Sequence, residues 1–289
     1  MRLILLLLGS LVGCSGDPAP PSVASPIVGT PLARPVDGIV HAAGSGAMVP
    51  LGRALAAAWA ARGGSPRLVV EASIGSAGGV RAAADGAVDV GLVSRALNDE
   101  ERGLGLEEVP LGRDVILLAA NPEAAFDRIS SDDLCALHRG AHRLLADGGH
   151  AVLLLRDRGE SANGVLDRAI PCMAGAREAA LADGNLRVLY HDAAMVEAIA
   201  STPRALGVSN LGSLVASHAP LRTLALDGRR PSLEAVADGS WPLQRPLALV
   251  ARRDRVERLR PLLAFIASDE GRAITRAAGY LPPTGTRAP

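Results

Sequence analysis

The stretch EASIGSAGGVRAAADGAVDVGLVSRAL, residues 71–97, decides the fold of this 289-residue chain. It begins with a loop of small polar residues, continues with helical spacing over about 79–85, and ends in the apolar run 88–93. Residues 67–72, which overlap its first two positions, alternate and include β-branched side chains, which predicts a strand that leads into the loop. A strand, a small polar loop, a helix and a second strand in this order predict a mainly parallel α/β sheet.

The same strand–loop–helix unit occurs elsewhere in the chain. Residues 38–43 predict a strand that runs into GSGAMV (44–49), and Pro50 favours the first turn of a following helix. A later strand over 151–155 ends in RDRGESAN (156–163) before a helical stretch. Ligands of open α/β sheets lie at the carboxyl ends of the strands, so we expect these loops to border one crevice.

These loops carry the chemistry of an anion site. They offer backbone N–H groups at helix N-termini, short hydroxyl side chains, and arginines that keep their charge. A helix N-terminus is partly positive, and a tetrahedral oxyanion accepts several hydrogen bonds at once. A purely structural turn remains the alternative for any single loop.

Nucleotide sites are excluded by spacing. Val49 stands where a dinucleotide fingerprint that starts at Gly44 needs its third glycine, and the chain has no lysine for a P-loop. The formal net charge is zero and only 2% of residues are aromatic, which argues against a nucleic-acid partner. We expect no cofactor. His138 and His142 have helical spacing, but no third ligand is placed by the sequence, so no metal site is predicted.

The N-terminus predicts export. Residues 1–13 have a basic start and an apolar segment too short to cross a bilayer, and LVGC (11–14) resembles the lipobox of bacterial lipoproteins. Lipidation of Cys14 would anchor the protein to a bacterial membrane, inner or outer, through a flexible tether over 14–36. An ordinary secretory leader is the alternative. The other cysteines, Cys135 and Cys172, fit either a disulfide or two buried free thiols.

The segments GSGAMVPLGRAL (44–55) and 71–97 together resemble the phosphate-binding periplasmic proteins of ABC transporters, within the solute-binding protein superfamily. Weaker matches follow at ALGVSNLG (205–212), WPLQRPLALV (241–250) and FIASDEGRAITRAAGYLPP (265–283). The resemblance implies a type II periplasmic-binding-protein fold with two lobes, each a mixed, mainly parallel sheet flanked by helices, and a two-strand hinge. It places lobe I at 37–119 plus 243–289 and lobe II at 120–242.

The resemblance also implies the ligand-binding residues. They are Ser45, Ala47, Met48, Ser76, Ser94, Arg95, Arg156, Ser161 and Asn163. Met48 replaces a threonine of the phosphate-specific members, Ser94 replaces the aspartate that accepts a phosphate proton, and Glu160 brings an anion next to the ligand. Sulfate and molybdate therefore stay open beside phosphate. Asp89 is expected to orient the second loop.

The implied function is capture of a small oxyanion by a monomer that delivers it to an ABC permease without chemical turnover. A binding lobe kept for signalling or scaffolding is an alternative. A secreted serine hydrolase is another, because GESAN (159–163) nearly matches the nucleophile elbow G-x-S-x-G. Ser161 would be its nucleophile, followed in chain order by Asp192 and His218. Asn163 stands where that elbow needs glycine.

Overall fold

The computed structural model describes residues 38–124, 126–140 and 150–283. The predicted leader 1–13, the lipidation site Cys14, the tether 14–36 and His142 lie outside these residues. Within the described ranges, no helix has both the length and the apolar character needed to cross a membrane.

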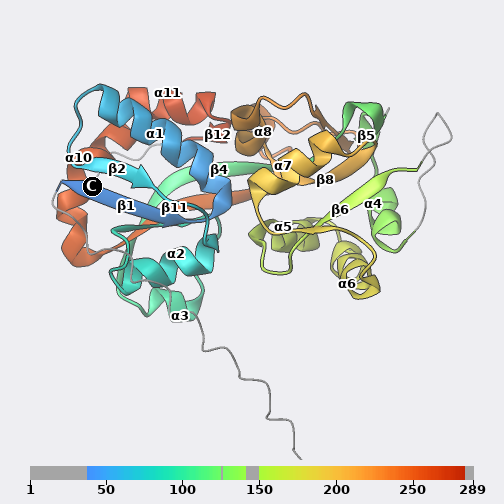
Figure 1. The fold of residues 1–289 in the computed structure, drawn as a ribbon, viewed down its shortest axis with the longest axis horizontal. Coiled ribbons are helices and arrows are strands. Elements are labelled where there is room, and N and C mark those ends of the chain that lie inside the picture. Colours follow the sequence, from blue (N-terminus) through green and yellow to red (C-terminus); the bar gives the residue numbers. More distant parts are fainter. Residues whose placement is uncertain (1–37, 125, 141–149, 284–289) are drawn as a thin grey trace, which may run out of the picture. The chain divides into compact units, whose positions relative to one another are not determined.

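Strands and helices alternate along most of the chain (Figure 1). The strands are β1 (Ile39–Gly44), β2 (Arg67–Val70), β3 (Val90–Val93), β4 (Leu106–Ala120), β5 (Arg128–Ile129), β6 (Val152–Arg156), β7 (Val188–Leu189), β8 (Ala205–Asn210), β9 (Arg222–Thr223), β10 (Ala225–Leu226), β11 (Gln244–Arg252) and β12 (Tyr280–Leu281). The helices are α1 (Val49–Ala61), α2 (Gly75–Ala84), α3 (Asp99–Arg102), α4 (Ser131–His138), α5 (Ser161–Ala169), α6 (Met173–Asp183), α7 (Asp192–Ser201), α8 (Leu211–Ser217), α9 (Leu233–Ala237), α10 (Arg253–Ala267) and α11 (Asp269–Ala277), with short 3-10 turns η1 (Gly46–Met48) and η2 (Pro122–Ala124).

One mixed sheet runs through the fold in the order β2-β1-β3-β11-β4-β8-β6-β7, and β9 and β12 also pair with β4. Parallel pairing joins β2, β1 and β3 at one end and β8, β6 and β7 at the other. The long strands β4 and β11 run antiparallel between the two sets. Along β4 the partner changes from β11 to β8 between Val115 and Ile116. The predicted α/β class is confirmed.

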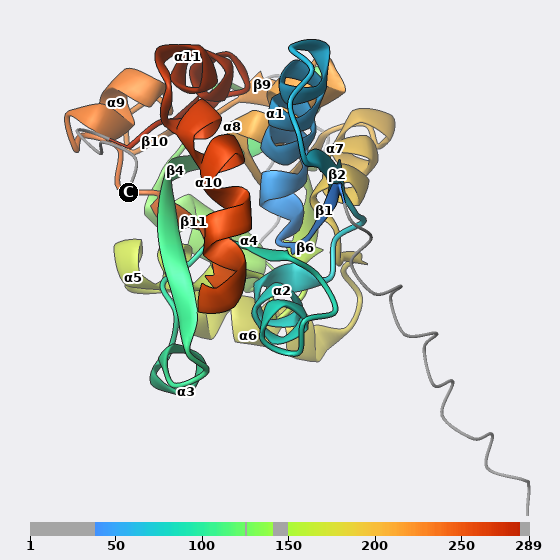
Figure 2. The same ribbon diagram turned by 90° about the vertical axis from the view of Figure 1, so that its left-hand side faces the viewer.

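Helices cover both faces of the first parallel set (Figure 2). On one face, α1 and α10 pack over β1, β3 and β11, and the predicted stripe Leu51, Leu55 and Trp59 of α1 is buried there. On the other face, α2 buries Val80 and Ala83 in a smaller cluster. Burial of this apolar stripe, more than intrinsic helix propensity, stabilises α1.

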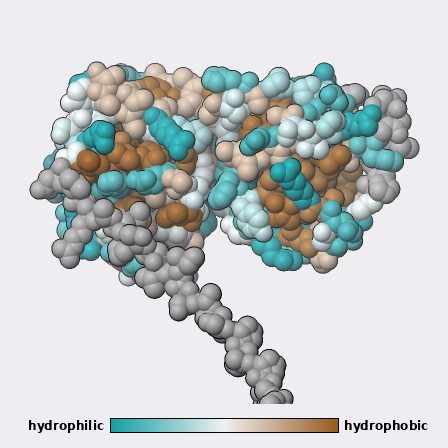
Figure 3. Space-filling model, in the orientation of Figure 1, coloured by the Kyte–Doolittle hydropathy of each residue, from teal (hydrophilic) through white to brown (hydrophobic). Residues whose placement is uncertain are grey.

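A second core surrounds the other parallel set. It joins buried residues of β4, β6 and β8 to helices α5, α6 and α7. Cys135 in α4 and Cys172, just before α6, form a disulfide at its edge, with an S–S distance of 2.06 Å. Seen from outside, polar residues border the apolar ones over both sets of elements (Figure 3).

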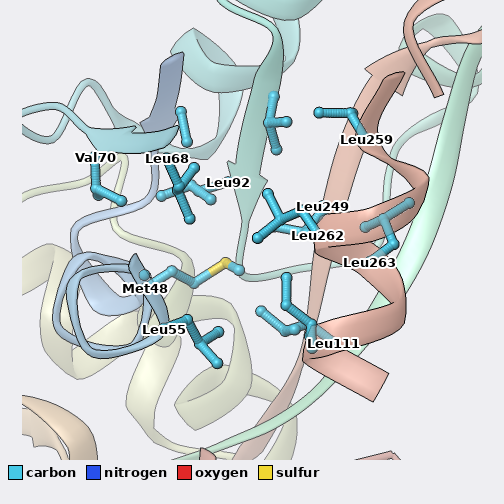
Figure 4. A pocket seen from close by; sticks show the side chains of 14 residues that line it. Met48, Leu55, Leu68, Val70, Leu92, Leu111, Leu249, Leu259, Leu262 and Leu263 are labelled. Atoms are coloured by element: carbon cyan, nitrogen blue, oxygen red, sulfur yellow. The ribbon is translucent and has the colours of Figure 1, made fainter. Parts of the chain in front are cut away.

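The first core contains a small apolar cavity of about 20 Å³ between α1, the sheet and α10 (Figure 4). Its wall includes Met48, Leu92, Leu249 and Leu262, and every residue that lines it is apolar. A cavity of this size has room for about one water, which needs polar partners that this wall does not offer. It is therefore a gap in packing and not a ligand site.

Candidate anion-binding site

A cleft of about 530 Å³ lies where the N-termini of α2, α5 and α7 meet the turn η1. From the first set of elements it is lined by Ser45, Gly46, residues 73–78 and Arg95, and from the second by Asp157, Gly159, Glu160, Ser161, Tyr190, His191 and Asp192. Each of the three loops predicted to share a crevice contributes to this wall. Because three helix N-termini meet here, their partial positive charges act on the same space.

The N-terminus of α2 is the part of this wall most open to an anion. The helix begins at Gly75, four residues before the predicted start, so Ser76 lies in its first turn. Its N-cap residue Ile74 makes no side-chain capping bond, and the first turn contains no acidic residue. The first amides of a helix have no partner within the helix. The Gly75 amide of α2 makes a long bond of 3.4 Å to Ser73 Oγ, and the amides that follow it in the first turn are available to a ligand.

Four serine hydroxyls predicted from separate loops lie together beside the cleft. Ser94 is at the centre: its Oγ is 2.7 Å from Ser45 Oγ and 3.1 Å from Ser161 Oγ. The backbone N–H of Ser94 donates to Ser76 Oγ at 3.2 Å. This cluster joins the end of β3 to the first turn of α5, and hydroxyls of this kind can each donate or accept.

A buried group of charges lies next to the serines. Arg156 Nη2 donates to Glu160 Oε2 at 2.7 Å and lies 3.5 Å from Asp192 Oδ2. Arg245 donates to Asp114 at 2.9 Å and to Glu160 Oε1 at 2.6 Å. Two arginines thus face three carboxyl groups, and both arginine side chains are only 2% exposed.

Burial raises the pKa of each of these carboxyl groups, and the nearby arginines lower it to different extents. Burial raises the pKa of Asp114 and of Asp192, and the nearby arginines only partly oppose this. For Glu160 burial also acts upward, but Arg245 and Arg156 outweigh it and hold the pKa at about 2. Glu160 is therefore the most firmly ionised of the three.

Arg156 keeps unused hydrogen-bonding capacity. Its Nε and Nη1 are buried and have no hydrogen-bond partner among the described residues. Leaving buried donors unpaired is costly, and a guanidinium binds an oxyanion through paired donors. These two N–H groups can therefore donate to a further anionic partner.

Other predicted ligand residues serve the framework. Ala47 is buried and its carbonyl accepts a bond from Tyr280 Oη at 2.6 Å. Met48 points into the first core beside the apolar cavity (Figure 4), and its amide donates to Ser45 O within η1. Asn163 is buried, and its amide donates to the Asp157 carbonyl at 2.7 Å, which braces the 156–163 loop. These three residues do not line the cleft, and neither do Ser94 and Arg156, which are buried behind its wall.

Arg95 does line the cleft, but it is held by a two-point bond to Glu101, with both distances at 2.6 Å. Asp89 has a different structural role from the one predicted. It accepts from the His41 amide at 3.0 Å and lies 3.8 Å from Arg255 of α10, so it ties β1 to α10 and not the second loop. His138 is buried, and its Nδ1 lies 2.8 Å from its own helix at Leu134 O.

Arg245 and Asp114 were not among the predicted site residues, and Asp192 was considered only as part of a hydrolase. Arg245 and Asp114 are paired across β11 and β4, far apart in the chain. The available signal was a single charge in each of two apolar strands, WPLQRPLALV and DVILLAA. Charges in such strands are rarely buried unless they are paired.

The contacts of Ser161 do not resemble those of a hydrolase nucleophile. Its Oγ accepts a bond from Arg245 at 2.6 Å, and arginine cannot take a proton from it. Glu160 Oε1 lies 3.4 Å away, but its pKa of about 2 makes it a weak base. His218 is exposed at the end of α8.

Comparison with known proteins places these features in a family. A family model for the PBP (periplasmic binding protein) superfamily domain matches residues 29–270. Over 95 residues the chain is 28% identical to the phosphate-binding protein PstS 2 of Streptococcus agalactiae, a match that spans 32% of this chain and 31% of that protein. The match therefore covers about a third of the relative's length.

Solved structures extend the likeness to most of the chain. A phosphate ABC-transporter substrate-binding protein from Clostridium perfringens, with bound phosphate, has a TM-score of 0.72 at 21% identity over 85% of this chain and 100% of that one. A phosphate-binding protein from Stenotrophomonas maltophilia has a TM-score of 0.63 at 14% identity over 85% and 91%. At these identities the likeness concerns the fold, and the expected two-lobe fold is confirmed. With the family model covering most of its length, the chain belongs to the PBP superfamily.

Proposed function

We propose that this protein captures a small oxyanion, most favourably phosphate, in the cleft between its lobes and presents it to an ABC transporter. The observation that carries the proposal is the uncapped N-terminus of α2 facing a cleft beside four serines and Arg156. Such a set of amides, hydroxyls and a guanidinium is suited to a tetrahedral anion. Relatives and structural neighbours that bind phosphate support the choice of ligand.

We assign the strands to two lobes by their pairing in the sheet. Lobe I contains β1, β2, β3 and β11 with the first part of β4, and lobe II contains β6, β7 and β8 with the last part. The change of partner between Val115 and Ile116 favours a crossing a few residues before the one expected at 119–120. An anion that contacts both lobes would favour the closed state through its higher affinity for that state.

We also propose where the protein is located and that it acts as a monomer. It is exported, anchored through Cys14 by the 14–36 tether, and acts as a monomer without catalysis. Sulfate and molybdate remain alternative ligands, because Ser94 is uncharged, whereas an aspartate at this position would repel a fully ionised anion.

Calorimetric titration with inorganic phosphate tests the site by comparing the wild type with the variant Ser76→Ala. Loss of this hydroxyl should weaken binding by about 1–3 kcal/mol, the cost of a lost hydrogen bond to a charged group. Ser217→Ala, an exposed change in α8, serves as the control and should leave affinity unchanged. Equal affinity for wild type and Ser76→Ala would move the site away from α2.

A further inference from the structure

Glu160 already has the surroundings that an oxyanion would need. Its carboxylate accepts from Arg156 at 2.7 Å and from Arg245 at 2.6 Å. The Ala162 amide, in the first turn of α5, donates to Oε1 at 3.3 Å, and Ser161 Oγ lies 3.4 Å from the same oxygen. Two guanidinium groups, a helix amide and a hydroxyl are the donor types expected for a bound oxyanion.

The role of helix cap does not explain this residue. Glu160 is the N-cap of α5, a position where Asn, Asp, Ser, Thr and Gly are preferred. Its capping bond to Ala162 is long, whereas its two bonds to arginines are short. The carboxylate is therefore placed for the arginines, and the cap is secondary.

Glu160 can also leave this position. Its side chain is 15% exposed and lines the cleft, so it can turn toward solvent. Arg245 would keep Asp114, to which it donates at 2.9 Å. Arg156 would keep only the 3.5 Å contact with Asp192. Its Nη2 would then lack its short bond, and its Nε and Nη1 have no hydrogen-bond partner among the described residues. Departure of Glu160 would thus leave Arg156 in need of a new anion.

We propose that Glu160 is an internal competitor that occupies the clamp formed by Arg156 and Arg245, so that an incoming oxyanion binds by displacing it. This inference rests on the proposed function and adds the residue that sets its affinity. The wild type should therefore bind the oxyanion more weakly than the two arginines alone would allow, because the Glu160 carboxylate must first leave them.

Calorimetry with inorganic phosphate on the full chain tests this with Glu160→Gln, which removes the charge and retains the size. The variant should bind phosphate at least about tenfold more tightly than wild type. Glu178→Gln is the matched control: it removes a charge that pairs with Arg158, in the same loop but at the surface, and with Arg177, and it should leave the affinity unchanged.

The outcomes separate this inference from the proposed function. If wild type binds phosphate and Glu160→Gln binds it no more tightly, the cleft function stands and the competitor role is wrong. If only the variant binds, the competitor role is supported and phosphate is not the natural ligand. If neither binds, both proposals fail.

A structure of the wild type with bound phosphate tests the same inference without the variant, which matters if the variant does not fold. We expect Arg156 to contact phosphate and the Glu160 carboxylate to have left Arg156. Phosphate bound in the cleft with the 2.7 Å contact between Arg156 and Glu160 intact would overturn the inference.

Discussion

At the scale of single residues, the site depends on how Glu160 and Asp192 share Arg156. Glu160 has a lowered pKa because two arginines outweigh its burial, whereas burial raises the pKa of Asp192. The two carboxyl groups are close neighbours with opposite shifts, so their removal should affect the protein in opposite ways.

Glu160→Gln should destabilise the fold by about 3–5 kcal/mol at pH 7, because it breaks a buried ion pair and leaves two arginines less compensated. Asp192→Asn should be neutral or stabilising, since the fold disfavours the ionised form of that residue. Urea denaturation of both variants measures this. Equal destabilisation by the two changes would contradict the assignment.

The pH dependence of stability gives a second check on Glu160. Its pKa falls on folding from 4.5 to about 2, so its contribution is present above 4.5 and is lost as the pH falls through 2. The difference in unfolding free energy between wild type and Glu160→Gln should therefore shrink over that range. We expect denaturation midpoints measured between pH 7 and pH 2 to converge. A difference that stays constant would show that Glu160 does not titrate this way.

At the scale of elements, the position of α2 depends on its close packing against the sheet. A Cβ added at Gly79 would lie 2.8 Å from Gly44 Cα and 2.9 Å from Ala43 O, both backbone atoms that cannot easily move. The glycine therefore lets the helix approach β1 closely, and this approach sets where the α2 amides meet the cleft.

Gly79→Ala should cost about 1–3 kcal/mol, because the strain of overpacking exceeds the gain in helix propensity. Gly175→Ala in α6 is the matched control: a Cβ there meets nothing within 4 Å, so the change should stabilise by up to about 1 kcal/mol. Thermal denaturation compares the two. Similar melting temperatures for both variants would argue against close packing of α2.

The disulfide closes a loop of 37 residues between α4 and α6. Replacing Cys135 and Cys172 together by serine should lower the unfolding free energy by about 2–4 kcal/mol, since the unfolded chain regains freedom. Urea denaturation of the double variant measures the loss. If reductant lowers the stability of wild type but not that of the variant, the bond is the cause; no effect in either would contradict it.

The sequence predicted most of the local elements but not the contacts between residues far apart in the chain. The strand–loop–helix units were predictable because their spacing is local: β1, α1 and β3 lie where apolar periodicity placed them. The start of α2 was missed because glycine and serine are typical of loops, although Ser76 and Gly79 are buried in the first turns of the helix. The pairing of Asp114 with Arg245 depends on the register of β4 and β11, which no local pattern reveals.

At the scale of the molecule, the buried charges connect the long central strands to the cleft. Arg245 lies on β11 opposite Asp114 of β4, close to the point where β4 changes partner, and it also reaches Glu160 and Ser161 at the start of α5. An anion that alters the contact at Glu160 would therefore act on the strands that join the two lobes. In the proposed function, this arrangement would link ligand binding to lobe movement.

The most direct test of the central claim is calorimetric titration of the wild-type protein with phosphate, sulfate, molybdate and a neutral sugar. The account predicts saturable one-to-one binding of phosphate, binding of other oxyanions at most as tight, and no binding of the sugar. Absence of binding for all three oxyanions, or binding of the sugar alone, would contradict the assignment of this cleft to an oxyanion.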